Sequence, residues 1–240
     1  MVPIQGLLFD KDGTLIDFHA TWLGPIRDLL LDLTEGDEAL AQALLEGVGY
    51  DPASRRVRAD SLLATGDSWD LSAAWQPQLP GRSRDELVEK IDSHALEAAV
   101  STAVPVLPLA DFFRRLRARG LALGIATSDS EAGARTLLRR EGAEDLLDFV
   151  SGYDSGHGAK SGPGMALAFS RKVGLPVENL AVVGDNLTDL LMGRAAGYGR
   201  SVGVLTGTGD HASLKVFADA VLPSIAELED WLLAQTEAAG

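Results

Sequence analysis

Two aspartates, Asp10 and Asp12, directly follow a short apolar segment near the start of the chain. Ile4 to Phe9 has the length and composition of a buried strand, and residues two apart on a strand point the same way. Like charges on one side of a strand end repel, so a folded chain keeps both only with a compensating cation or proton. The pair therefore predicts a divalent metal site, with one acid as ligand or nucleophile and the other moving protons. The alternative is a turn that merely ends the strand.

Further polar side chains follow other predicted strands. Thr127 and Ser128 come directly after the second core strand, and Asp185 follows another strand with Asp189 one helical turn later. Lys160 lies in a glycine-containing loop before a predicted helix. Because open α/β sheets place their sites at the carboxyl ends of parallel strands, we expect these side chains to converge on Asp10 and Asp12.

This set of side chains suits phosphoryl transfer. A hard dication such as Mg²⁺ prefers oxygen ligands, and Asp10 and Asp185 supply two carboxylates. Lys160, Thr127 and the helix N-terminus after Ser128 can hold phosphate oxygens. Each residue also has an ordinary structural role open to it, as a helix cap or a solvated loop lysine. Their joint placement at strand ends favours the functional interpretation.

The elements that position these residues alternate along the second part of the chain. Apolar segments at 121–126, 149–150, 180–183, 201–205 and 220–222 are separated by helical patterns. Such alternation predicts an α/β fold with a doubly wound parallel sheet and helices on both faces.

A long helical segment separates the first strand from the second. A crossover between parallel strands needs little more than a dozen residues, whereas more than a hundred lie between Asp10 and Leu121. We predict an inserted all-helical domain at 18–99, with 1–17 and 100–240 forming the core. Such an insert can exclude water from a site at the strand ends. The alternative is that its helices only enlarge one common core.

Composition excludes several classes of function. The 240 residues include no cysteine, which rules out disulfides and thiolate chemistry. The formal net charge of −14 disfavours binding to nucleic acid or anionic membranes. No apolar segment has the length of a membrane span, and we find no signal-peptide pattern. We therefore expect a cytoplasmic protein with a small-molecule partner, either a monomer or a homodimer.

These motifs together resemble the haloacid dehalogenase-like hydrolase superfamily. Motif one is similar to residues 10–14 (Asp-Lys-Asp-Gly-Thr), motif two to Thr127, motif three to Lys160 and motif four to residues 184–189. The resemblance covers the predicted core and places residues 18–99 where the family has its C1 cap. Within the superfamily, the chain looks most like phosphoglycolate phosphatases, and a Rossmann-like core is implied.

The resemblance implies a role for each matching residue. Asp10 would be the nucleophile that forms an aspartyl-phosphate, and Asp12 would act as acid and then base. Thr127 and Lys160 would stabilise the transferring phosphoryl group. The metal site for Mg²⁺ would involve Asp10, Asp185, the backbone carbonyl of Asp12 and, in support of the metal waters, Asp189. Lys11 departs from the family, which usually has an apolar residue between the two acids.

The implied reaction is hydrolysis of a small, phosphoglycolate-like phosphomonoester. A second acid at position 12 favours hydrolysis of the aspartyl-phosphate. Two alternatives stay open: a β-phosphoglucomutase-like phosphotransferase, and a non-catalytic binding module that retains the fold. Specificity is expected in the insert, where His19 is the first candidate for a phosphate or substrate contact because it lies closest in sequence to Asp10. Other possible contacts are Trp22, Arg55, Arg56, Arg58 and Arg82.

Overall fold

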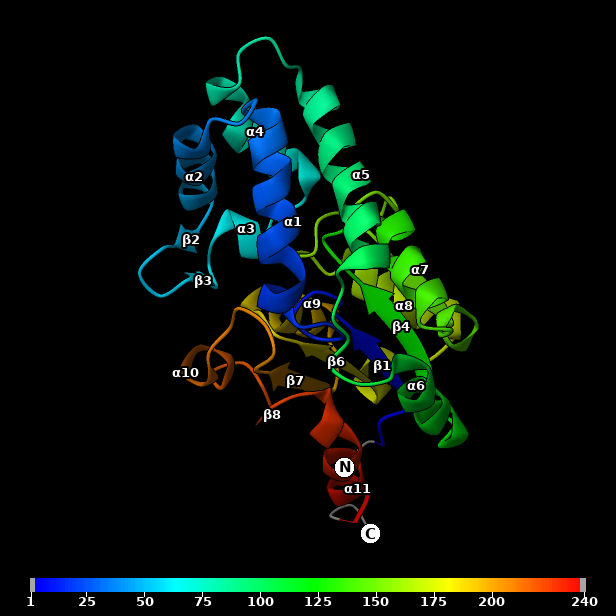
Figure 1. The fold of residues 1–240 in the computed structure, drawn as a ribbon. Helices are drawn as coiled ribbons and strands as arrows, with labels where there is room; N and C mark the ends of the chain where they lie inside the picture. The colour runs from blue at the N-terminus through cyan, green and yellow to red at the C-terminus, as the bar shows by residue number, and fades with distance from the viewer. Residues whose placement is uncertain (1–2, 238–240) are drawn as a thin grey trace.

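The computed structural model describes residues 3–237 and contains a parallel sheet at its centre (Figure 1). In this part of the chain the sheet has six strands in the order β5-β4-β1-β6-β7-β8. The strands are β1 (Gly6–Phe9), β4 (Ala122–Ala126), β5 (Phe149–Ser151), β6 (Leu180–Gly184), β7 (Arg200–Val204) and β8 (Ala220–Leu222). Strand β1 is central and pairs with β4 and β6. The predicted doubly wound α/β fold is confirmed.

Helices cover both faces of this sheet because its strands are apolar on both sides. On β1, Leu7 and Phe9 contribute to one buried cluster, while Leu8 contributes to the cluster on the opposite face. The first face is covered by α6 (Leu109–Ala118), α7 (Glu131–Arg140) and α11 (Leu228–Glu237). The second is covered by α8 (Gly164–Val173), α9 (Leu187–Ala196) and α10 (His211–Leu214). Short 3₁₀ turns are η2 (Glu144–Leu146), η3 (Val177–Asn179) and η4 (Ile225–Glu227).

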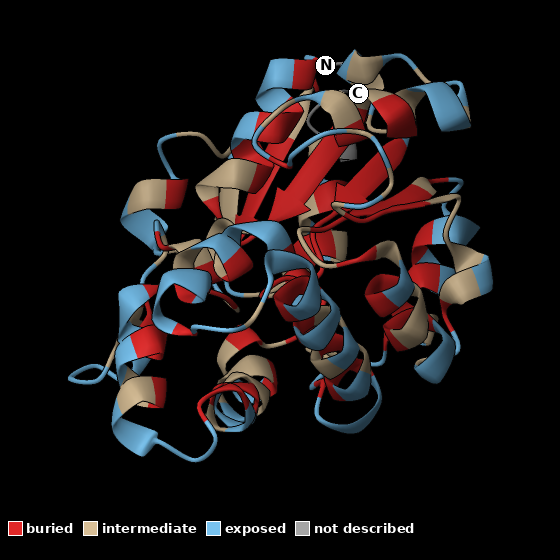
Figure 2. Ribbon diagram, turned by 90° about the horizontal axis from the view of Figure 1, so that it is seen from above, coloured by how far each residue is buried: buried red, intermediate tan, exposed pale blue. Residues whose placement is uncertain are grey.

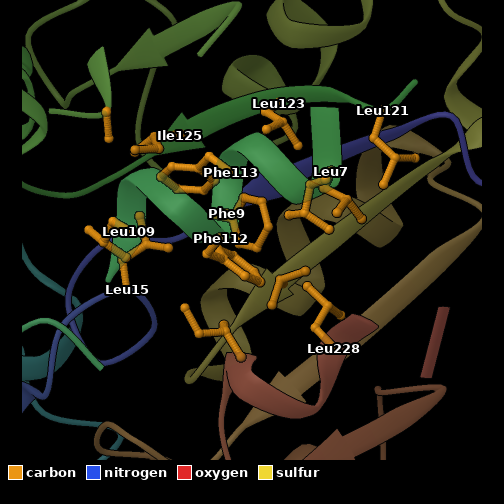
Figure 3. Close-up of a cluster of buried hydrophobic side chains, with 14 of the residues drawn as sticks. Leu7, Phe9, Leu15, Leu109, Phe112, Phe113, Leu121, Leu123, Ile125 and Leu228 are labelled. Atoms are coloured by element: carbon orange, nitrogen blue, oxygen red, sulfur yellow. The ribbon is translucent and has the colours of Figure 1, made fainter. Parts of the chain in front are cut away.

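Aromatic packing fixes the strand that carries Asp10. The ring of Phe9 meets those of Phe112 and Phe113 edge to face, with centroids 5.9 and 5.7 Å apart (Figure 3). All three side chains are buried, and Figure 2 shows most of the sheet as buried. The residue that follows Phe9 therefore starts from a rigid base, which a site at the strand end requires.

The segment between β1 and α6 forms a helical layer over one end of the sheet (Figure 1). Its helices are α1 (Phe18–Leu33), α2 (Glu38–Gly47), α3 (Leu62–Thr65), α4 (Ser68–Trp75), η1 (Gln76–Gln78) and α5 (Arg84–Ser101). A capping box starts α5, where Ser83 and Glu86 bond each other's backbone. Buried side chains between Phe18 and Ile91 form their own hydrophobic cluster.

The all-helical description of this insert is wrong in one detail. Tyr50–Asp51 (β2) and Arg56–Val57 (β3) form a small antiparallel hairpin. The Asp51 carboxylate accepts from Ala53 N–H at 3.0 Å, and Arg55 adopts φ +56°, so local turn chemistry forms the hairpin. Periodicity did not reveal it because each strand is only two residues long.

The predicted boundaries of the insert remain a proposal, which the separate cluster at 18–91 supports. Helix α5 continues to Ser101, and Ala99 packs with Ile16 and Leu137 of the core. The last turn of α5 therefore belongs to both parts. No helix within residues 3–237 combines the length and hydrophobicity needed to cross a membrane.

Candidate active site

Three neighbouring strands place polar residues at their carboxyl ends. Asp10 follows β1, and its backbone N–H donates to the Val183 carbonyl at 2.9 Å. Thr127 follows β4 and donates its backbone N–H to the Ser151 carbonyl at 3.0 Å. Asp185 follows β6. The sheet thus brings together side chains that lie far apart in the sequence, as the strand-end pattern predicted.

A cluster of buried carboxylates is the centre of this site. Asp10, Asp185 and Asp189 each offer an oxygen, and these oxygens lie within 4.8 Å of one another. The amine of Lys160 contacts an oxygen of Asp10 and lies 2.8 Å from Asp189 Oδ1. Asp189 is fixed by the start of α9, where its other oxygen accepts from Asn186 N–H at 3.0 Å. The predicted convergence of these acids with Lys160 is therefore present.

The charges in this cluster do not balance. Three carboxylates face one ammonium group, which leaves a formal charge of −2 when all are ionised. Burial raises the pKa of Asp10 to about 6, although Lys160 opposes the shift. Burial and the neighbouring Asp10 raise the pKa of Asp185 well above its ordinary value. For Lys160, burial works against the charged form, but Asp10 and Asp189 raise its pKa overall.

The same cluster fits a hard divalent cation. Asp10 Oδ2 is buried and has no hydrogen-bond partner in the described structure, whereas buried polar atoms usually have one. Carboxylate oxygens from Asp10, Asp185 and Asp189 are the donor type that Mg²⁺ prefers. The Asp12 carboxylate is not part of this set, and the predicted contact of the Asp12 backbone carbonyl with the metal stays a prediction.

A glycine loop after β7 holds Asp185 in place, and the sequence did not reveal it. Thr208 donates its backbone N–H to Asp185 Oδ2 at 2.7 Å. A Cβ atom at Gly207 would lie 1.9 Å from the same oxygen, and one at Gly13, where φ is +89°, would lie 2.7 Å from Asp185 Cγ. The signal was a Thr-Gly-Thr-Gly run at residues 206–209 directly after a predicted strand.

Asp12 has two oxygens in different surroundings. Its Oδ1 accepts from Trp22 Nε1–H at 2.7 Å and from the Lys11 amine at 2.7 Å. Its Oδ2 meets only the Thr127 hydroxyl, at the long distance of 3.5 Å. The first oxygen is thus fixed by two donors, whereas Oδ2 has no close donor. Trp22, on α1, places an insert residue against the predicted acid–base group.

Lys11 neutralises a second buried acid that the sequence did not identify. Its amine lies 3.0 Å from Asp129 Oδ2 and 5.1 Å from the Trp22 ring centroid, and the residue is 1% exposed. Burial raises the pKa of Asp129, and Lys11 opposes that shift. The charged residue that departs from the family pattern therefore connects Asp12, Asp129 and Trp22.

Replacing Lys11 with Met is expected to destabilise the fold by roughly 3–5 kcal/mol, because it leaves a buried carboxylate unpaired. Chemical denaturation of the variant and of the unmodified protein at neutral pH measures this loss. The double variant Lys11→Met with Asp129→Asn removes both charges and should recover most of the stability. Equal stability of the single and double variants would show that the two charges do not interact.

The remaining predicted site residues lie differently. Ser128 lines the cavity, but its hydroxyl donates to the Thr65 carbonyl at 3.2 Å. Thr127 is fully buried and its hydroxyl also accepts from Asp129 N–H at 3.0 Å. His19 is not among the residues that line the cavity, because its Nε2 accepts from Val57 N–H at 3.2 Å within the insert. The structure therefore does not bring His19 to the cavity, and its predicted phosphate contact stays a prediction.

The insert closes a cavity over the acidic cluster. The cavity has a volume of about 120 Å³, with Asp10, Asp12, Asp185 and Lys160 on the core side and residues of the insert opposite. Tyr153 donates its hydroxyl to Asp92 of α5 at 2.7 Å, and Asn186 Nδ2 donates to the Ala59 carbonyl at 2.7 Å. These contacts hold the insert over the strand ends.

Comparison with known proteins assigns the family. The model of the haloacid dehalogenase-like hydrolases matches residues 4–197, which include all the strand-end acids described above. The chain belongs to the haloacid dehalogenase-like hydrolases. The family resemblance that the motifs predicted is thus confirmed, and the chain is an enzyme of the phosphatase type.

Relatives and solved structures of this hydrolase family agree with the assignment. A phosphoglycolate phosphatase of Neisseria meningitidis is 28% identical over 96% of this chain and 89% of its own length. A phosphoglycolate phosphatase of Rhodospirillum rubrum is 29% identical over 95% and 90%, respectively. The crystal structure of CbbY from Rhodobacter sphaeroides in complex with phosphate has a TM-score of 0.69 at 19% identity, covering 94% of this chain and 96% of that one. The last likeness shows the shared fold.

Proposed function

We propose that this hydrolase cleaves small phosphomonoesters with Mg²⁺ through an aspartyl-phosphate on Asp10. The observation that carries the proposal is the buried set of Asp10, Asp185 and Asp189 on the core side of the cavity. Lys160 pairs with two of these acids, Asp10 and Asp189. A phosphoryl dianion needs positive charge around it, and this acidic cluster supplies that only with a bound dication and Lys160. The phosphatase relatives support the same reaction class.

Each residue then has a chemical task. Asp10 attacks phosphorus with a carboxylate oxygen, and the bond from phosphorus to the leaving oxygen breaks. Lys160 holds Asp10 in place and adds positive charge near the transferring group. Mg²⁺, held by the three carboxylates, would neutralise phosphate charge. Asp12 Oδ2 would donate a proton to the leaving alcohol and then accept one from the water that hydrolyses the aspartyl-phosphate.

The resemblance and the relatives point to a small phosphorylated metabolite such as phosphoglycolate as the first substrate to test. The phosphotransferase alternative shares the same core chemistry and differs in its product. Isomerised hexose phosphate with little free phosphate would favour that alternative, whereas stoichiometric phosphate release would favour hydrolysis.

A phosphate-release assay over a panel of phosphomonoesters, with 4-nitrophenyl phosphate included, tests the proposal. We expect turnover with Mg²⁺, loss of turnover in EDTA and recovery when Mg²⁺ is restored. Because Mg²⁺ relieves repulsion among buried carboxylates, it should also raise the Tm in a concentration-dependent way. The exposed Asp28, on the outer surface of α1, provides a control: Asp28→Asn should keep the Mg²⁺-dependent rise, whereas Asp185→Asn should lose it.

Two results would contradict the proposal. One is phosphate release that is equally fast in EDTA and in Mg²⁺. The other is a Tm that does not respond to Mg²⁺ in the unmodified protein, combined with no turnover of any ester in the panel.

A further inference from the structure

The insert presents an apolar wall to the acidic cluster. Side chains on four of its helices, α1, α3, α4 and α5, line the cavity opposite Asp10 and Lys160, and most of them are hydrocarbon or aromatic. The largest apolar side chains of this wall include Trp22, Ile26 and Leu29 on α1, Leu63 on α3, and Leu71 and Trp75 on α4. In the proposed function, the phosphate is held by the core, so this wall would face the leaving alcohol.

Positive charge is scarce along the same wall. Of the described residues that line the cavity, Lys160 and His94 are the only basic ones, and Lys160 is already paired with Asp10 and Asp189. The four insert arginines that the sequence offered as substrate contacts are absent from the lining; they are Arg55, Arg56, Arg58 and Arg82. Arg56 donates instead to the Gly207 carbonyl, at 3.4 Å.

An acidic residue of the insert adds to the excess of negative charge in the cavity. Asp67 also lines the cavity from the insert, and its carboxylate accepts from Asp70 N–H at 3.0 Å as the cap of α4. A substrate carboxylate placed against the insert would lose its water, meet leucine and isoleucine side chains and approach Asp67. An alkyl or aryl group in the same place would gain by leaving water. The wall therefore discriminates against an anionic leaving group.

We propose that the preferred substrates are phosphomonoesters of uncharged, mainly apolar alcohols, not of carboxylate-bearing alcohols such as glycolate. This inference rests on the proposed phosphatase function and specifies its substrate class. It assigns Ile26 and Leu71, both half-buried in the cavity wall, as specificity-determining residues.

Matched esters test the inference on the unmodified enzyme. Isobutyl phosphate and phosphoglycolate have similar shapes but differ in charge, and benzyl phosphate with 4-carboxybenzyl phosphate makes a second pair with similar leaving groups. We expect kcat/KM to favour the uncharged member of each pair by at least about tenfold. Along a series of linear alkyl phosphates, kcat/KM should rise roughly fourfold per added methylene until the wall is covered.

Substitutions inside and outside the cavity wall test whether the wall causes the preference for uncharged esters. Leu71→Arg places a cation in the wall and should lower or reverse the preference for uncharged esters. Ala73→Arg adds the same charge to the exposed side of α4 and should leave the preference unchanged. If Leu71→Arg does not fold, Ile26→Arg makes the same test from another helix of the wall, α1.

Failure of this inference can be told apart from failure of the proposed function. Equal or faster turnover of phosphoglycolate than of isobutyl phosphate overturns the inference and leaves the phosphatase function intact. An unchanged preference in a folded cavity-wall variant also overturns it. Absence of turnover with every ester, 4-nitrophenyl phosphate included, overturns the proposed function on which the inference rests.

Discussion

Replacing Asp10 with Asn is expected to lower kcat for phosphomonoesters by about 10⁴-fold or more, because an amide oxygen is a poor nucleophile toward phosphorus. Asp10 directly follows the central strand β1, contacts Lys160, belongs to the carboxylate cluster and has an oxygen without a hydrogen-bond partner in the described structure. Steady-state phosphate release with 4-nitrophenyl phosphate and excess Mg²⁺ measures the loss.

The loss of activity should not be a loss of folding. Burial raises the pKa of Asp10 to about 6, so the ionised side chain is less favourable in the folded than in the unfolded protein. A group with a raised carboxyl pKa opposes folding once the pH exceeds its unfolded value, and Asn removes that cost. In metal-free buffer at pH 8, Asp10→Asn should therefore unfold at the same temperature as the unmodified protein or at a higher one.

A control substitution distinguishes the loss of the nucleophile from the loss of one negative charge. Asp28→Asn removes one negative charge from an exposed position on α1 and should retain full activity. Substantial turnover by purified Asp10→Asn, measured before any deamidation of the new side chain, would reject Asp10 as the nucleophile. A large decrease in Tm for Asp10→Asn would instead mean that the Lys160 contact stabilises the fold.

The sequence was sufficient to predict the arrangement of the core because one physical rule covers it. Parallel strands that are apolar on both faces must be covered by helices, and their carboxyl ends lie at one edge of the sheet. Asp10, Thr127 and Asp185 each follow an apolar segment, so their convergence did not depend on long-range detail. Helix ends were also well defined, since Asn186 and Gly197 bracket α9 as cap residues.

Contacts between the insert and the core could not be predicted in the same way. Trp22 was one of several apolar residues on a helical stripe, and nothing in its spacing distinguished the ring that donates to Asp12. His19 is close to Asp10 in sequence, yet the turn at the start of α1 directs it to the hairpin backbone at Val57. Both outcomes depend on how α1 leaves the sheet, which is a tertiary property.

The loop at residues 206–209 illustrates a different limit. Its role depends on the absence of side-chain atoms at Gly207, where a Cβ would overlap Asp185, and on a backbone N–H at Thr208. Glycines are common in loops, so the Thr-Gly-Thr-Gly run does not by itself reveal that its backbone N–H and its missing side-chain atoms serve Asp185. Lys11 had a distinctive type, but its partner Asp129 lies after β4, and only the pairing of β1 with β4 brings them together.

Asp12→Asn is expected to slow turnover by roughly 10²–10⁴-fold and to trap the phosphorylated enzyme when the leaving group is 4-nitrophenolate. This leaving group departs without a proton, so attack by Asp10 can proceed in the variant. Hydrolysis of the aspartyl-phosphate needs a base at the position of Asp12 Oδ2, where Asn places an oxygen or amide nitrogen that cannot accept the water proton. The substitution should therefore slow hydrolysis of the aspartyl-phosphate more than its formation.

The trapped species gives a direct measurement. Rapid mixing with ³²P-labelled 4-nitrophenyl phosphate followed by acid quenching should leave label on Asp12→Asn, and hydroxylamine should remove it because acyl phosphates are cleaved by that reagent. Asp10→Asn, treated in parallel, should carry no label. An alkyl phosphate, whose leaving group needs protonation, should label Asp12→Asn far more slowly than the aryl ester does.

The geometry around Asp12 makes this prediction specific to one oxygen. Trp22 and Lys11 both donate to Oδ1, so Asn at position 12 keeps an acceptor for them only if its carbonyl takes that place. Its amide nitrogen then faces Thr127, at the atom that must exchange the proton. Trp22→Phe removes one donor but leaves Oδ2 a carboxylate oxygen, so it should slow turnover without accumulation of label. Accumulation in Trp22→Phe equal to that in Asp12→Asn would show that the position of the carboxylate, more than its basicity, limits hydrolysis of the aspartyl-phosphate.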